Sequence, residues 1–204
     1  DITDGNASAW NTLETNKPWF DAVSGTFVAW PNTSADIAVF GGGTSGTAGT
    51  VTVGNVTANG IIFNAPFAGN YTLSGGSISL EGTTPTITAN VNAAISSVLT
   101  GTAGLVKNGT GNLTLSGSTA NTYTGTTTVS NGTLTLSKTG GVNAVGGDVI
   151  INGGLLAFTQ SNVIPDTASI TLLSGRLQLG GLTETLANLT LSGGDSNANT
   201  SSNG

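Results

Sequence analysis

Short runs of alternating apolar and polar residues follow one another along most of the chain. Examples are Val-Thr-Val at residues 51–53, Tyr-Thr-Leu at 71–73 and Ser-Ile-Ser-Leu at 77–80. Such alternation turns one set of side chains inward and the other toward water, as in a half-buried β-strand. Glycine-rich turn clusters separate the runs, for example residues 74–76. We find no sustained apolar stripe at helical spacing, so the pattern predicts an almost entirely β protein.

The alternation itself recurs at a nearly fixed interval. Gly-x-Leu-x-Leu blocks lie at residues 111–115, 132–136 and 175–179, with a looser copy at 153–158. The first leucines of the four blocks are Leu113, Leu134, Leu155 and Leu177. A second apolar series, with almost the same interval, consists of Val129, Val149, Ile170 and Leu189. Two short strands repeated about every 21 residues are typical of a solenoid.

One such repeat cannot fold alone. Its few inward apolar side chains do not offset the entropy of ordering a whole repeat, whereas stacked repeats share one core and one backbone ladder. The sequence therefore predicts a right-handed parallel β-helix with coils of about 21 residues. An antiparallel β-sandwich, which also uses short strands and glycine turns, is the alternative. The retained register of the repeats favours the β-helix.

Three segments differ in composition. Residues 1–48 hold all the tryptophans and half of the phenylalanines, and we expect them to form an aromatic-rich cap over the first coil. Residues 49–193 are expected to form the β-helix, and the polar residues 194–204 a linker or tail. The same aromatic side chains, if exposed, would suit a platform for sugars or a protein partner. The candidate contacts for a glycan or partner are Trp10, Trp19, Trp30 and Tyr123.

The residue types present argue against catalysis. The chain has no histidine and no cysteine, which removes the commonest general base and the thiol nucleophile. Asp148, Asp166 and Glu184 are the best candidates for a carboxylate pair, but they drift out of register with the strands and are interpreted as loop acids. The glycine-aspartate repeat that binds calcium is absent. We therefore expect no enzyme activity, no metal and no cofactor, and a polysaccharide-active enzyme is the least favoured hypothesis.

Charge restricts the partners. The net charge is −6 with only four basic residues, so there is no basic surface for nucleic acid. No apolar run is long enough to span a membrane as a helix, and we expect no membrane insertion. Several Asn-x-Ser/Thr sequons follow from the composition, and glycosylation is left open.

The clearest repeat resembles a known family. The sequence GLVKNGTGNLTLSG at residues 104–117, NTYTGTTTV at 121–129 and GTLTL at 132–136 are closely similar, in order and spacing, to the autotransporter-associated β-strand repeat. That repeat occurs in the passenger regions of bacterial autotransporters and in large bacterial surface proteins. The resemblance implies a parallel β-helix that is secreted and extracellular or on the cell surface. It implies a scaffold and no particular chemistry.

Two functions follow as expectations. The first is a structural protein, either a cell-surface stalk or the subunit of a head-to-tail fibre, which would self-associate through solenoid ends with unpaired backbone groups. The second is an adhesin or carbohydrate-binding surface module, whose partners would be glycans or other surface proteins.

Overall fold

The computed structural model describes residues 9–12, 19–21, 26–41 and 47–193. These residues form strands and turns, and no helix occurs among them. The strands are β1 (Ala9–Trp10), β2 (Trp19–Asp21), β3 (Thr26–Val28), β4 (Ile37–Phe40), β5 (Thr50–Ala58), β6 (Gly60–Phe63), β7 (Tyr71–Leu80), β8 (Thr86–Ala89), β9 (Ala93–Ile95), β10 (Val98–Thr100), β11 (Leu105–Asn108), β12 (Asn112–Leu115), β13 (Thr127–Val129), β14 (Thr133–Leu136), β15 (Val149–Phe158), β16 (Ser169–Gln178) and β17 (Asn188–Leu191).

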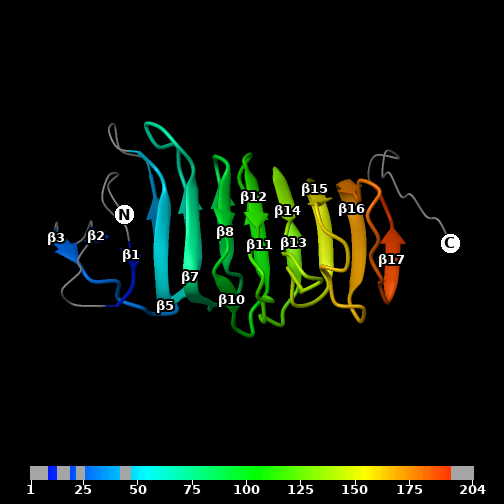
Figure 1. Ribbon diagram of the computed structural model, residues 1–204, viewed down its shortest axis with the longest axis horizontal. Helices are drawn as coiled ribbons and strands as arrows, with labels where there is room; N and C mark the ends of the chain where they lie inside the picture. Colours follow the sequence, from blue (N-terminus) through cyan, green and yellow to red (C-terminus); the bar gives the residue numbers. More distant parts are fainter. Residues whose placement is uncertain (1–8, 13–18, 22–25, 42–46, 194–204) are drawn as a thin grey trace.

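All of these strands except β2 and β3 belong to one parallel sheet that winds around the core. Along one side the ladder runs β5–β7–β9–β12–β14–β15–β16, and along another β4–β6–β8–β11–β13–β15. Figure 1 shows the strands stacked side by side along the long axis, from β1 and β5 at one end to β17 at the other. The antiparallel pair β2–β3 stands apart from this sheet. The parallel β-solenoid is confirmed, and the antiparallel sandwich is wrong.

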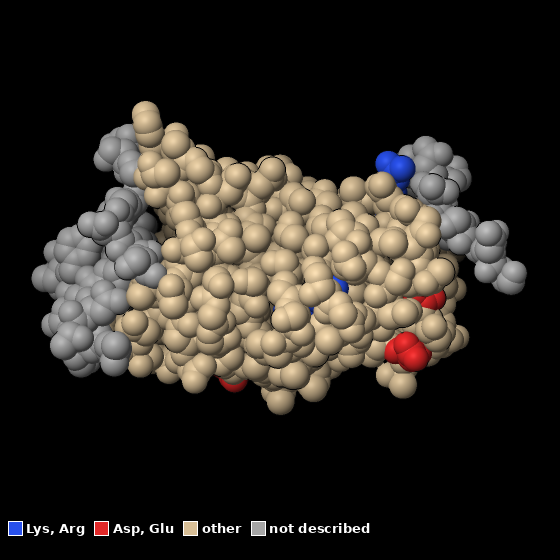
Figure 2. All heavy atoms as spheres, viewed as in Figure 1, with Lys and Arg blue, Asp and Glu red and all other residues tan. Residues whose placement is uncertain are grey.

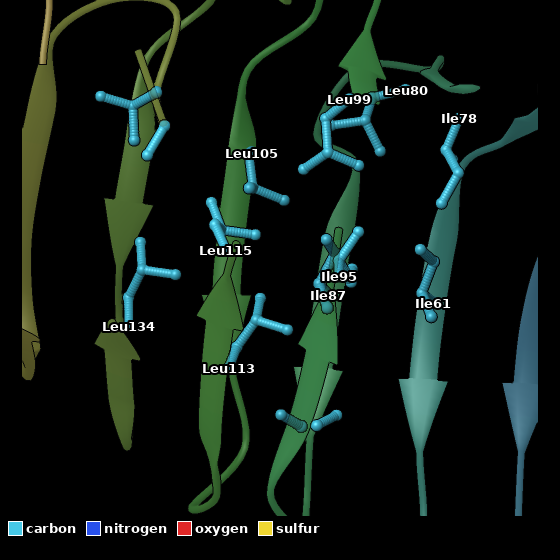
Figure 3. Close-up of a cluster of buried hydrophobic side chains, with 14 of the residues drawn as sticks. Ile61, Ile78, Leu80, Ile87, Ile95, Leu99, Leu105, Leu113, Leu115 and Leu134 are labelled. Atoms are coloured by element: carbon cyan, nitrogen blue, oxygen red, sulfur yellow. The ribbon is translucent and has the colours of Figure 1, made fainter. Parts of the chain in front are cut away.

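Inward side chains form columns along the stack. One column takes one side chain from each successive coil and consists of Leu73, Ile95, Leu115, Leu136 and Phe158. Figure 3 shows buried leucines and isoleucines of neighbouring coils lying beside one another between the strands. Nearly all of these side chains are fully buried. Each coil is therefore stabilised by burial against the coils before and after it.

Two register assignments made from the sequence are wrong. Leu134 pairs with Leu156, while Leu155 pairs with the outward-facing Thr133. Gly153, which has a positive φ of 115°, and Gly154 add a residue at this turn and shift the column by one. In the second series Val149 pairs with Thr127 and not with Val129. Thr127 is a buried polar residue at an inward position, which a count of apolar residues does not find.

An aromatic cluster lies at the first coils. The Trp10 ring meets the Trp30 ring edge-on at 5.2 Å and the Phe40 ring at 5.6 Å. Phe40 stacks on Phe63 at 5.4 Å, in register across β4 and β6. The Trp30 indole N–H donates to the carbonyl of Thr57 at 2.9 Å. Within the segment 1–48, β1 and β4 therefore already pair with the parallel sheet.

The last described coil differs. Strand β17 pairs with β16, and among the described residues no strand pairs with its other edge. Leu189 and Leu191 are 42% and 57% exposed, whereas Ile170 and Leu172, their partners one coil earlier, are 0% and 2% exposed. The apolar columns thus continue into a coil that is covered on one side only.

Candidate functional site

The structure gives the predicted aromatic contacts a different position. Trp10 and Tyr123 are fully buried, and Trp30 is 5% exposed. None of these three side chains offers a ring face to a sugar. Trp19 begins β2, and its side chain lies outside the part of the chain that the structure describes.

Tyr123 belongs to a polar network inside the solenoid. Its hydroxyl lies 2.7 Å from the Thr127 hydroxyl, and burial raises its pKa well above the ordinary range. The neighbouring Asn121 is also buried, and its amide accepts from the Leu99 N–H at 3.0 Å and donates to the Ala144 carbonyl at 2.7 Å. This side chain thus joins three successive coils. These contacts make the segment around Tyr123 part of the internal structure.

One aromatic side chain is exposed among those that the structure describes. Phe67 is 76% exposed and lies in the turn between β6 and β7. A backbone hydrogen bond of 2.8 Å from the Ala48 N–H to the Ala68 carbonyl, beside Phe67, fixes this turn to the preceding segment. An aromatic ring held outward on a fixed turn is a common anchor for a partner. No periodic pattern in the sequence includes Phe67, so sequence reasoning missed it.

The three candidate acids are separated in function as well as in register. Asp148 accepts a hydrogen bond from the Ser169 N–H at 2.8 Å, one coil further on. Glu184 accepts from the Val163 N–H at 2.7 Å and the Ile164 N–H at 3.3 Å, one coil earlier, and burial raises the pKa of its carboxyl. Two of the acids thus join backbone groups of adjacent coils. No group of three or more acids able to hold a metal ion occurs among the described residues.

Two lysines occupy the core, which the sequence pattern did not predict. Lys107 is fully buried in the column between Ile87 and Val129. Its ammonium donates to the carbonyls of Asn108, Gly109 and Asn131 at 2.8, 2.9 and 3.1 Å. Burial lowers its pKa to about 8.

Lys138 is likewise fully buried, and its ammonium donates to the Ser116 carbonyl at 2.8 Å. Burial also lowers its pKa. Two of the four basic side chains in the sequence are therefore structural cations that bind the carbonyls of turns. Figure 2 shows that the middle of one face of the molecule carries almost no charged surface.

The fold and its surface define a class of protein: a parallel β-solenoid with an uncharged polar exterior and a continuous internal core. No helix long and apolar enough to cross a membrane occurs among the described residues.

Comparison with known proteins agrees with this class. Residues 105–136 match the family model of the passenger-associated transport repeat, so the chain contains a copy of that repeat. The chain is also similar to the adhesin BmaC autotransporter of Brucella suis biovar 1 (strain 1330), with 38% identity over 193 residues. The match covers 93% of this chain and 5% of the relative, so the chain spans a small fraction of that protein's length. No solved structure matches the chain. The resemblance to autotransporter passenger repeats is thus confirmed.

Proposed function

We propose that this chain is a non-catalytic structural segment of a bacterial surface protein, outside the cell, where it acts as a rigid stalk. The observation that carries the proposal is the continuous register of inward columns through coils that include a passenger-associated transport repeat. Repeated coils in one register extend a protein by about 4.8 Å each without adding a new kind of contact. The similarity to an autotransporter adhesin supports the extracellular location.

The stalk proposal is tested by removing one coil in register. Deleting residues 112–132 joins Gly111 to Thr133, and because Asn112 pairs with Thr133 the inward columns stay aligned. We expect this variant to keep a cooperative unfolding transition and the β-type circular dichroism spectrum. Deleting only residues 112–121 breaks the register, and we expect it to abolish the transition. Equal behaviour of the two deletions would contradict a solenoid stalk built of interchangeable coils.

The absence of a binding role is tested separately. The purified chain is applied to glycan arrays and to immobilised matrix proteins, and a stalk segment is expected to bind none of them. Saturable micromolar binding would favour the second candidate function, an adhesive module. Phe67 is the observation that favours that candidate, because its exposed ring is placed outward on a fixed turn. In that case Phe67→Ala would remove the binding, and Phe158→Leu, a change in the core, would not.

Self-association is a further part of the proposal. Leu189 and Leu191 together with the free edge of β17 suit the docking of a second copy by strand addition. The first coils carry an aromatic cluster instead of an open apolar rung, which disfavours the head-to-tail fibre relative to a pair of copies joined at β17. Sedimentation over a concentration series distinguishes a monomer, a dimer and an open polymer. We propose no nucleic-acid partner, because the chain has only four basic residues.

A further inference from the structure

The four basic residues of this chain differ in how a protease can reach them. They are Lys17, Lys107, Lys138 and Arg176. Proteases of trypsin-type specificity cut after lysine or arginine, by inserting that side chain into an acidic pocket. Lys17 is followed by Pro18, and such proteases do not cut before proline. The three remaining positions depend on the fold.

The two core lysines are closed to such a pocket. Both side chains are fully buried, and both ammonium groups bind backbone carbonyls. Lys107 reaches the Asn131 carbonyl, and Lys138 reaches the Ser116 carbonyl, each in the adjacent coil. The strands that carry or precede them, β11 and β14, are also paired on both edges. A protease could bind either lysine only after several coils had separated.

Arg176 has the opposite environment. Its side chain is exposed on β16, and Leu173 in the same strand is 44% exposed. Gly175, directly before it, has a positive φ of 90°. Strand β17 pairs only with Ser169–Leu172, so no described strand covers the outer edge of β16 at Arg176. An extended segment with a free edge is what a protease cleft binds, by adding a strand to it.

We propose that the Arg176–Leu177 bond is a processing site for an arginine-directed extracellular protease, at which the last coil is separated from a protease-resistant solenoid. The step is hydrolysis: water adds across the peptide bond, which leaves a carboxylate on Arg176 and an amine on Leu177. Because Leu177 is 1% exposed, cutting requires local opening of the final coil. That opening costs less than separation of central coils, which are covered on both sides. This inference is independent of the stalk proposal.

The test is digestion of the full chain by trypsin under native conditions, with mass spectrometry of the fragments over time. We expect the first cut after Arg176, giving residues 1–176 and 177–204, while the bonds after Lys107 and Lys138 stay intact. Arg176→Gln is expected to reduce the rate of this cut to background, and Arg176→Lys to retain it. The unfolded chain in denaturant is the control, and there all three bonds are expected to be cut.

Two results would overturn the proposal. One is a native cut after Lys107 or Lys138 before the cut after Arg176. The other is no cut after Arg176 under conditions in which the unfolded chain is fully digested. Arg176→Gln changes an exposed side chain, so its fold can be verified by an unchanged circular dichroism spectrum before digestion.

Discussion

The first coils and the last described coil of the solenoid use the same parallel ladder but bury their apolar side chains to different extents. At the first coils Phe40 is fully buried, and its ring lies 5.6 Å from Trp10, 5.4 Å from Phe63 and 5.8 Å from Tyr71. At the last coil Leu191 is 57% exposed, although it continues a column that is buried elsewhere. Backbone pairing alone thus does not decide how firmly a coil is held. The side chains covering its far side do.

Truncation at the aromatic end should have the largest effect. Phe40→Ala removes a fully buried ring that contacts three others, and we expect a loss of about 3–5 kcal/mol in the free energy of unfolding. Urea unfolding followed by circular dichroism measures the change. A loss below about 1 kcal/mol, well under the usual cost of such a truncation, would show that the aromatic cluster does not stabilise the first coils.

A central coil tests whether internal polar bridges matter as much as rings. Asn121→Ala leaves the buried Leu99 N–H and Ala144 carbonyl without their partner, and we expect a loss of about 2–4 kcal/mol. The matched control is Asn55→Ala, whose side chain accepts an exposed hydrogen bond from Ser77, with an expected change within about 0.5 kcal/mol. Equal losses for the two variants would contradict a structural role for Asn121.

The core lysines predict a dependence on pH. Burial lowers the pKa of Lys107 to about 8 from its ordinary value of 10.5. Between these values the unfolded chain binds more protons than the folded chain, so the contribution of Lys107 to the free energy of unfolding rises with pH. Lys138, whose pKa burial also lowers, acts in the same direction. The urea midpoint should therefore increase from about pH 8 to about pH 9.5, and less so in Lys107→Met.

Measurements stay below about pH 10 because burial raises the pKa of Tyr123. Above that pH the unfolded chain loses a tyrosine proton that the folded chain keeps, which lowers stability. An equal rise of the midpoint in wild type and Lys107→Met would mean that Lys107 is not the cause.

The smallest effect is expected at the open rung. Leu191→Ala removes a side chain that is already more than half exposed, so the free energy of unfolding should fall by less than about 1 kcal/mol. Leu172→Ala, one coil earlier in the same column, should cost about 2–5 kcal/mol. Similar losses at the two positions would show that the last rung is covered in solution.

The register of the repeats made the fold predictable, and exceptions within it made some residues unpredictable. Leu113 and Leu134 do pair, because the Gly-x-Leu-x-Leu blocks keep their spacing there. The spacing fails at Leu155, where the Gly153-Gly154 turn adds a residue. Alternation with Leu105 does place Lys107 at an inward position, but a charged residue is expected at the surface unless its partners are known. Those partners are backbone carbonyls, which sequence patterns do not reveal.

The candidate site was less predictable than the fold. The concentration of tryptophans identified an aromatic cluster correctly, but composition does not distinguish a buried ring from an exposed one. Trp10 and Trp30 pack inside, while Phe67 lies outside as a single residue in a turn. Exposure of one side chain depends on how a turn is held, here by the contact between Ala48 and Ala68.

Peptide-resolved hydrogen–deuterium exchange of the intact chain tests most directly the claim that coverage on both sides, rather than strand pairing alone, holds each coil. We predict slow exchange in β4 and β6 through β15, and fast exchange in β17, although β4 and β17 are both paired to a single neighbour in the sheet. Exchange in β4 as fast as in β17 would contradict this claim.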